Sequence, residues 1–221
     1  RAGDVIPKII GVLKNLRTGR EKEFKMPKHC PVCGGSVIQQ TGEVAFRCVN
    51  KKCPAKNKEA LAHFVSRKAF NIIGLGDKIL ERFSELGLGS DPADIFFLEK
   101  ADIAPLERFG EKSADNIIAS IEAGKKIPLA KFIFALGIVH VGEETAQVLA
   151  KQIIAKIKNR KLEMKVPVIL NLFQDLSLED LQKIPDVGPK VAQSTYDYFH
   201  SAYASRLLQK LDQAGIIIEL P

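Results

Sequence analysis

Residues 73–80 read Ile-Gly-Leu-Gly-Asp-Lys-Ile-Leu, and this stretch decides the fold because it recurs along the chain. Related segments lie at residues 107–114, 139–146 and 185–192. In each segment an apolar residue precedes a glycine, and Ala or Leu four residues after that glycine opens a run with helical spacing. The repeat predicts a mainly α domain of four units, each made of a helix, a tight hairpin and a second helix.

The glycines that mark the predicted hairpins are Gly76, Gly110, Gly142 and Gly188, which lie 34, 32 and 46 residues apart. Glycine adopts backbone angles closed to other residues and lets a second backbone come close. Successive backbone N–H groups in such a turn, together with the N-terminus of the next helix, form an anion site. Any one of these turns, taken singly, is more typical of an ordinary glycine-capped helical hairpin. Four copies in one frame favour phosphate binding.

The four copies differ in the side chains around the glycine. Two residues past it, where an ammonium group can reach a phosphate, stand Lys78, Lys112 and Lys190. The third copy has Glu144 at this position. The first copy alone keeps a second glycine, Gly74, in place of which the others have Arg108, His140 and Asp186. We therefore expect the first hairpin to bind phosphate best and the third to bind it least.

All 4 cysteines fall in one short segment, as Cys30-x2-Cys33 and Cys48-x4-Cys53 separated by 14 residues. Two short-spaced pairs on either side of a hairpin-sized insert are what a tetrahedral structural zinc site requires. Residues 36–40 and 43–47 flank Thr41-Gly42, which indicates a β-hairpin turn in this insert. The four predicted thiolate ligands close the coordination shell, so the metal is expected to hold structure and to activate no water.

Disulfides and a redox-active pair are the alternatives for these cysteines. A redox Cys-x-x-Cys normally stands at a helix start beside a βαβ pattern, which the sequence lacks. No secretory signal or apolar run long enough for a membrane helix is present, so we expect a cytoplasmic, reducing location and no membrane partner. These features favour zinc.

The net charge of +7 is unevenly distributed. Residues 1–70 carry a net charge of +10, whereas residues 71–221 carry −3. Thirteen of the basic residues surround the predicted metal module, which favours contact with phosphates more than a merely solvated surface. A hydrophobic content of 46% excludes global disorder.

The sequence lacks the usual catalytic signatures. It contains no phosphate loop ending in Gly-Lys-Ser/Thr, no His-Glu-x-x-His pair and no Lys-x-Asp-Gly of the kind used for covalent nucleotide transfer. Its 4 histidines are scattered and form no acid–base cluster. We therefore predict no catalytic residue in this chain. Residues 2–13 have the pattern of a strand without a neighbouring partner, which suggests a piece of a longer protein.

These parts together resemble bacterial NAD-dependent DNA ligase. The resemblance is carried by the strand-like residues 1–8, the cysteine segments 30–34 and 48–55, residues 63–67 and residues 135–138, together with the four hairpin repeats. The stretch between the third and fourth repeats, around residues 156–168, is longer than the family pattern.

The resemblance implies domains at residues 1–26 (the end of an OB fold and a linker), 27–58 (a four-cysteine zinc finger) and 59–221 (a helix-hairpin-helix domain). It implies non-sequence-specific binding of nicked duplex DNA through backbone phosphates, in an enzyme that seals nicks between a 5′ phosphate and a 3′ hydroxyl. NAD and magnesium would act at adenylation and OB domains outside this chain, so the fragment alone would be inactive.

Two other functions are compatible with the residues. Tandem hairpins also occur in DNA-binding modules of other repair or recombination proteins, although the zinc segment and the OB strand argue against this. A scaffold whose helical repeats bind protein, with a solely structural zinc, is the third possibility. Binding to nicked and intact duplex across a salt series distinguishes the three.

Overall fold

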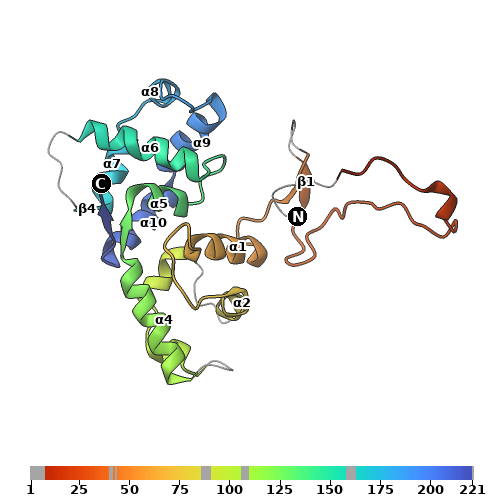
Figure 1. Ribbon diagram of the computed structural model, residues 1–221, viewed down its shortest axis with the longest axis horizontal. Coiled ribbons are helices and arrows are strands. Elements are labelled where there is room, and N and C mark those ends of the chain that lie inside the picture. Colours follow the sequence, from red (N-terminus) through yellow and green to blue (C-terminus); the bar gives the residue numbers. More distant parts are fainter. Residues whose placement is uncertain are drawn as a thin grey trace. The chain divides into compact units, whose positions relative to one another are not determined.

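The computed structural model describes residues 8–39, 42, 44–85, 91–105, 110–157 and 163–220 (Figure 1). The chain forms two compact units, residues 1–50 and residues 51–221. The first unit contains two short strands and one 3-10 helix, and the second contains all the α-helices of the described residues. The prediction of a mainly helical protein with a short β hairpin in the cysteine segment is therefore confirmed.

The first unit is built around a two-stranded antiparallel sheet. Strand β1 (Val37–Gln39) pairs with β2 (Phe46–Cys48), and Val37 lies opposite Cys48. This is the hairpin that the turn signal at Thr41-Gly42 predicts. A short 3-10 helix, η1 (Lys14–Leu16), lies N-terminal to it.

The strand predicted over residues 2–13 is not formed in its described part. Residues 8–13 lie in no strand, and Ile9 and Ile10 are 89% and 95% exposed. A strand needs a neighbour to satisfy its backbone N–H and C=O groups, and the described residues offer none here. Residues 1–7 of this prediction lie outside the described residues.

The second unit consists of helices and three short strands, of which the last strand follows the final helix. The longer helices are α1 (Pro54–Val65), α2 (Asp77–Glu85), α4 (Glu111–Gly124), α5 (Leu129–Ala135), α6 (Glu143–Lys156), α7 (Val166–Gln174), α9 (Pro189–Phe199) and α10 (Ala202–Gln213). The shorter ones are η2 (Pro92–Phe97), α3 (Lys100–Ile103) and α8 (Leu178–Gln182). None of the helices in the described ranges is long and apolar enough to cross a membrane.

The helices pair as the four repeats predict. The pairs α1 and α2, α3 and α4, α5 and α6, and α8 and α9 pack against each other, each pair on either side of one repeat. In all four repeats the N–H of the Ala or Leu donates to the carbonyl of the repeat glycine, with N···O distances of 3.1 Å for Leu80, 3.1 Å for Ala114, 2.9 Å for Ala146 and 3.0 Å for Ala192. All four side chains are buried, so this position, the fourth residue of the second helix, anchors that helix in the core.

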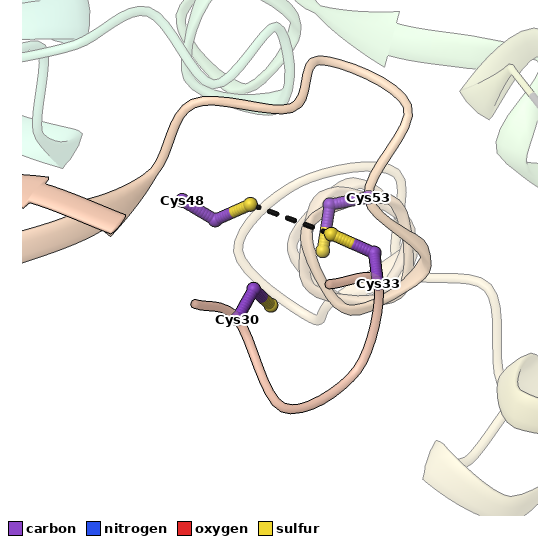
Figure 2. Close-up of side chains that lie close together, drawn as sticks. All are labelled: Cys30, Cys33, Cys48 and Cys53. Carbon is purple, nitrogen blue, oxygen red and sulfur yellow. Dashed lines mark hydrogen bonds between the residues drawn. The ribbon is translucent and has the colours of Figure 1, made fainter. Parts of the chain in front are cut away.

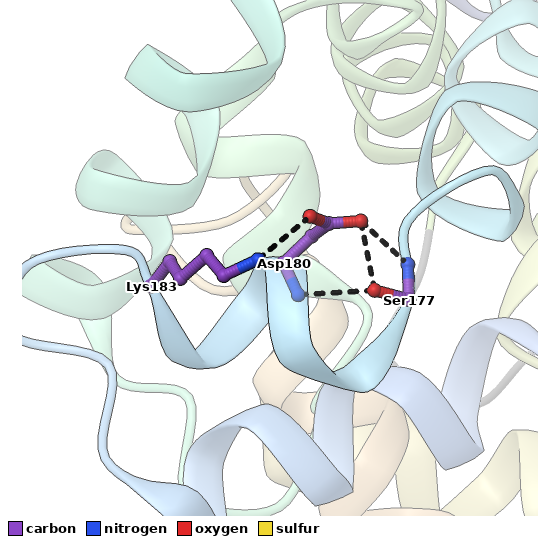
Figure 3. Close-up of polar contacts among 3 residues, drawn as sticks. All are labelled: Ser177, Asp180 and Lys183. Carbon is purple, nitrogen blue, oxygen red and sulfur yellow. Dashed lines mark hydrogen bonds and ion pairs between the residues drawn. The ribbon is translucent and has the colours of Figure 1, made fainter.

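A capping box shows how the fourth repeat begins (Figure 3). The Ser177 hydroxyl accepts a hydrogen bond from the N–H of Asp180 (3.1 Å), and the Asp180 carboxylate accepts from the N–H of Ser177 (3.2 Å) and from its hydroxyl (2.8 Å). Lys183 lies 3.8 Å from the same carboxylate. These contacts satisfy the free N–H groups at the start of a five-residue helix.

A small sheet that the sequence analysis did not predict ties distant segments together. Strand β5 (Ile217–Glu219) lies between β3 (Lys126–Pro128), to which it is parallel, and β4 (Glu163–Lys165), to which it is antiparallel. Strand β4 and the start of helix α7 (Val166–Gln174) lie in the stretch around residues 156–168 that we expected to be longer than the family pattern, and residues 158–162 of it lie outside the described ranges. Strands of three residues are too short for a period-2 pattern to be recognised.

Candidate metal centre and nucleic-acid interface

The four cysteines come together as the spacing predicts (Figure 2). Their Sγ atoms all lie within 4.8 Å of one another, and those of Cys33 and Cys48 are 3.5 Å apart. A disulfide requires about 2.0 Å between sulfurs, whereas four sulfurs at about 2.3 Å from one zinc lie about 3.8 Å apart. The cysteines are free, so the disulfide alternative disagrees with the structure.

Tight backbone turns hold the thiols in this arrangement. The N–H of Cys30 donates to the carbonyl of Gly35 (2.7 Å), and the N–H of Gly34 donates to the carbonyl of Cys30 (2.9 Å). Gly34 has a φ of +69°, which glycine adopts without strain. Cys53 is the N-cap of α1, with Pro54 in the first turn. Cys30 and Cys33 lie in a turn rather than at a helix start, so the redox geometry is not formed.

The protonation chemistry of the cluster fits a dication. Desolvation, followed by contacts with the thiols of Cys33 and Cys30, raises the pKa of Cys48 to about 11. The Cys48 thiol therefore does not ionise at neutral pH unless a cation stabilises its thiolate. Four soft sulfur ligands that can surround an ion tetrahedrally are a donor set that zinc prefers. The chain thus has a four-cysteine zinc finger in which no ligand position is left for a reacting water.

The left-handed backbone in the hairpins falls two residues before the repeat glycine. Gly74, His140 and Asp186 have φ values of +100°, +67° and +64°. Arg108, at the same position of the second repeat, lies outside the described residues. His and Asp can adopt this conformation because their short polar side chains tolerate it. The loss of glycine in the third and fourth copies therefore leaves the turn intact.

The repeat glycines themselves need no special backbone angles, which corrects one reason given for them in the sequence analysis. Gly110, Gly142 and Gly188 are N-caps with φ values of −110°, −85° and −72°, which any residue can adopt. A Cβ atom added at these positions or at Gly76 would meet nothing within 4 Å. No intramolecular contact in the described structure explains glycine here. The space beside these glycines is open to an external group.

The side chains predicted to accompany these turns lie where a ligand could reach them. Lys78, Lys112 and Lys190 are exposed, and none of them forms an ion pair with another described residue. The apolar residues before the glycines, Leu75, Val141 and Val187, are buried, as predicted for residues that pack between the two helices. Phe109 of the second repeat lies outside the described residues.

An ion pair within the chain occupies the helix start at the third hairpin. The Lys68 ammonium lies 2.7 Å from the carboxylate of Glu143, the first residue of α6. The hydrogen bond to Glu143, together with the field of Glu144, raises the pKa of Lys68. Two carboxylates in the first turn compete with any phosphate for the positive end of the helix. Lys68 is one of the thirteen basic residues that the sequence places around the metal module, but its pairing with Glu143 was not predicted, since the two residues lie 75 positions apart in the chain.

Two further contacts missed from sequence fix the first hairpin. The N–H of Ile73 donates to the Ser120 hydroxyl on α4 (2.7 Å), and the His63 ring on α1 lies 2.7 Å from the carbonyl of Phe134 on α5. The partners are separated by 47 and 71 residues, so no local pattern could have revealed these contacts.

Comparison with known proteins gives two family matches. Residues 29–55 match the C4 zinc finger domain of NAD-dependent DNA ligase, and residues 131–208 match the helix-hairpin-helix motif. The first match contains all four cysteines. The second contains the third and fourth glycine turns.

Curated relatives are similar along nearly the whole chain. The chain is 42% identical to a DNA ligase of Pelotomaculum thermopropionicum over 98% of its length, 43% identical to one of Desulfitobacterium hafniense over 99%, and 44% identical to one of Listeria innocua over 98%. It spans about 30% of the length of these relatives. The chain therefore carries the C4 zinc finger of the NAD-dependent DNA ligases together with a helix-hairpin-helix motif, and it corresponds to one segment of the DNA ligases to which it is similar.

Proposed function

We propose that this chain is the duplex-DNA-binding portion of an NAD-dependent DNA ligase that seals nicks between a 5′ phosphate and a 3′ hydroxyl. The observation that carries the proposal is the empty space around the repeat glycines at the starts of α2, α4, α6 and α9. Backbone N–H groups at a helix N-terminus with no Cβ in the way can approach a phosphate closely. Contacts to phosphates carry no base information, so we expect binding that does not depend on DNA sequence.

The hairpins differ in the strength we assign to them. The first has Gly74, Gly76 and the exposed Lys78, which forms no ion pair with the described residues, and it is the strongest site proposed. The second and fourth add Lys112 and Lys190 beside Gly110 and Gly188 in the same way. The third, at Gly142, is the weakest because Glu143 and Glu144 occupy the first turn of α6.

In the zinc finger we propose that Cys30, Cys33, Cys48 and Cys53 ligate one zinc ion. Four thiolates leave no open position, so the metal contributes folding free energy and no chemistry. The sequence has no Lys-x-Asp-Gly nucleotide-transfer motif, so NAD and magnesium would act on residues outside this chain. We expect incubation with NAD to produce no adenylated chain, and a labelled covalent adduct would contradict this.

The test is DNA binding measured by fluorescence anisotropy, with nicked and intact duplexes of several sequences over a salt series. If about 5 phosphates are neutralised, the logarithm of the affinity falls with the logarithm of salt concentration with a slope of about −4 to −5. Equal affinities across sequences are expected. The absence of duplex binding at low salt would favour the scaffold function instead.

Matched variants connect the affinity to the hairpins. Lys78→Ala and Lys190→Ala each remove one exposed ammonium beside a repeat glycine, and each should reduce the salt slope by about 1. Lys151→Ala is the control, because Lys151 is exposed on α6 away from the turns. If the two hairpin variants bind like the control while Glu144→Ala alters binding, the proposed ranking is wrong.

A further inference from the structure

The tip of the first hairpin presents an apolar side chain to solvent. Ile73 is 71% exposed, although its neighbours Ile72 and Leu75 are buried. A single exposed isoleucine is common on protein surfaces and needs no explanation by itself. What distinguishes Ile73 is that the structure around it is fixed and that it adjoins the strongest phosphate site proposed above.

Two contacts hold Ile73 in place. Its N–H donates to the Ser120 hydroxyl (2.7 Å), so the tip is tied to α4. The next residue, Gly74, has a φ of +100° and lies so close to α4 that an added Cβ would be 2.8 Å from Cγ1 of Ile117. The side chain of Ile73 is therefore presented on a preorganised turn, which reduces the entropy cost of a contact made there.

The chemistry beside Ile73 indicates what the side chain would touch. Gly76 lies three residues further along, with open space around it, and Lys78 is exposed and forms no ion pair with the described residues. In a nucleic-acid strand every phosphate is flanked by sugars, and the carbon-rich face of deoxyribose is apolar. A phosphate held at Gly76 would bring a neighbouring sugar to the same hairpin tip.

We infer that Ile73 packs against a deoxyribose of the strand whose phosphate binds at the first hairpin. This inference rests on the proposed DNA-binding function and deepens it, because it adds an apolar contact with a sugar to the proposed contacts with phosphates. The third hairpin supplies an internal comparison. Its corresponding residue, Val139, is 63% exposed, but Glu143 and Glu144 begin the following helix, so the phosphate site proposed beside Val139 is the weakest of the four.

The experiment compares Ile73→Ser, Ile73→Leu and Val139→Ser in the zinc-loaded 221-residue chain, using duplex-DNA affinity across a salt series. Ile73→Ser should weaken binding by about 5- to 10-fold, which corresponds to losing roughly half of the burial of an isoleucine side chain. The salt slope should stay at the wild-type value because no counterion is involved. Ile73→Leu should bind within about 2-fold of wild type, and Val139→Ser should bind like wild type. Thermal unfolding verifies that all variants are folded, as the exposure of both residues leads us to expect.

The possible outcomes distinguish failure of this inference from failure of the proposed function. If the wild-type chain binds duplex and Ile73→Ser binds it with the same affinity, the sugar contact is refuted and the proposed phosphate sites are unaffected. A weaker affinity accompanied by a smaller salt slope would also overturn it, because Ile73 would then act through the phosphate site. Equal losses in Ile73→Ser and Val139→Ser would refute the role of the adjoining phosphate. Failure of the wild-type chain to bind duplex would refute the proposed function and this inference together.

Discussion

Gly74 and Gly76 are two residues apart in one turn, yet the structure assigns them separate tasks. Gly74→Ala places a Cβ 2.8 Å from Cγ1 of the buried Ile117 and leaves an L-residue at a φ of +100°. The left-handed backbone costs about 1–2 kcal/mol, and overpacking a core contact costs about 1–3 kcal/mol. We therefore expect Gly74→Ala to lower the free energy of unfolding by about 2–4 kcal/mol.

Gly76→Ala is the matched control, because an added Cβ there meets nothing within 4 Å and φ lies outside the left-handed region. Its stability should be unchanged or up to about 1 kcal/mol higher, since alanine restricts the unfolded chain. Its duplex affinity should fall, because the methyl group occupies the space proposed for a phosphate.

Thermal and urea unfolding, followed by circular dichroism, measure the first effect of these two variants. For a domain of this size a loss of 2–4 kcal/mol lowers Tm by about 5–15 °C. Fluorescence anisotropy with labelled duplex, at a temperature where both variants are folded, measures the second effect. If Gly76→Ala is destabilised as much as Gly74→Ala, or if Gly74→Ala keeps the wild-type Tm, the division of tasks between the two glycines is refuted.

Three other perturbations test the zinc finger, the third hairpin and the fourth repeat. Chelation should release zinc and make all four cysteines reactive to alkylation while the helical signal persists; native cysteine protection without zinc by elemental analysis would contradict this. Glu144→Lys should raise duplex affinity and increase the salt slope by about 1, whereas Asp175→Lys, the same charge change at the end of α7, should do neither. The hydrogen bond from the Ser177 hydroxyl lowers the pKa of the Asp180 carboxyl below its ordinary value of 3.8. The ionised carboxylate therefore stabilises the fold fully above that pH, and this stabilisation is lost as the pH falls through the lowered pKa. Asp180→Asn should therefore be destabilised in urea at pH 7, with a difference that narrows towards pH 3; an equal difference at both pH values would count against the capping box.

Most of the helical architecture was predictable because its signal is local. The repeat places an apolar residue, a glycine and a small or aliphatic residue at fixed offsets, and all three offsets are short. Leu75, Val141 and Val187 are buried as predicted, and Leu80, Ala114, Ala146 and Ala192 lie in the first turns of their helices, which begin three residues earlier. The cysteine spacing was predictive for the same reason, since a tetrahedral site constrains short segments directly.

The conformational role of the glycines was only partly predictable. The repeated glycine pattern correctly indicated a turn that needs a left-handed backbone conformation. It assigned that conformation to the repeat glycine, whereas the residue two positions earlier adopts it. His140 and Asp186 have positive φ, whereas Gly142 and Gly188 do not. A sequence pattern shows where glycine recurs, and it does not reveal whether a backbone angle or the space around the residue is the reason.

The sequence by itself determined the four helical hairpins, the cysteine cluster and the expected rank of the phosphate sites, because each depends on residues close together in the chain. The tertiary structure alone decided which contacts join those parts. The central strand β5, the tie from Ile73 to Ser120 and the pairing of Lys68 with Glu143 each join segments dozens of residues apart. Such partners are selected by packing of the whole core, and packing depends on shapes and distances that no local pattern records.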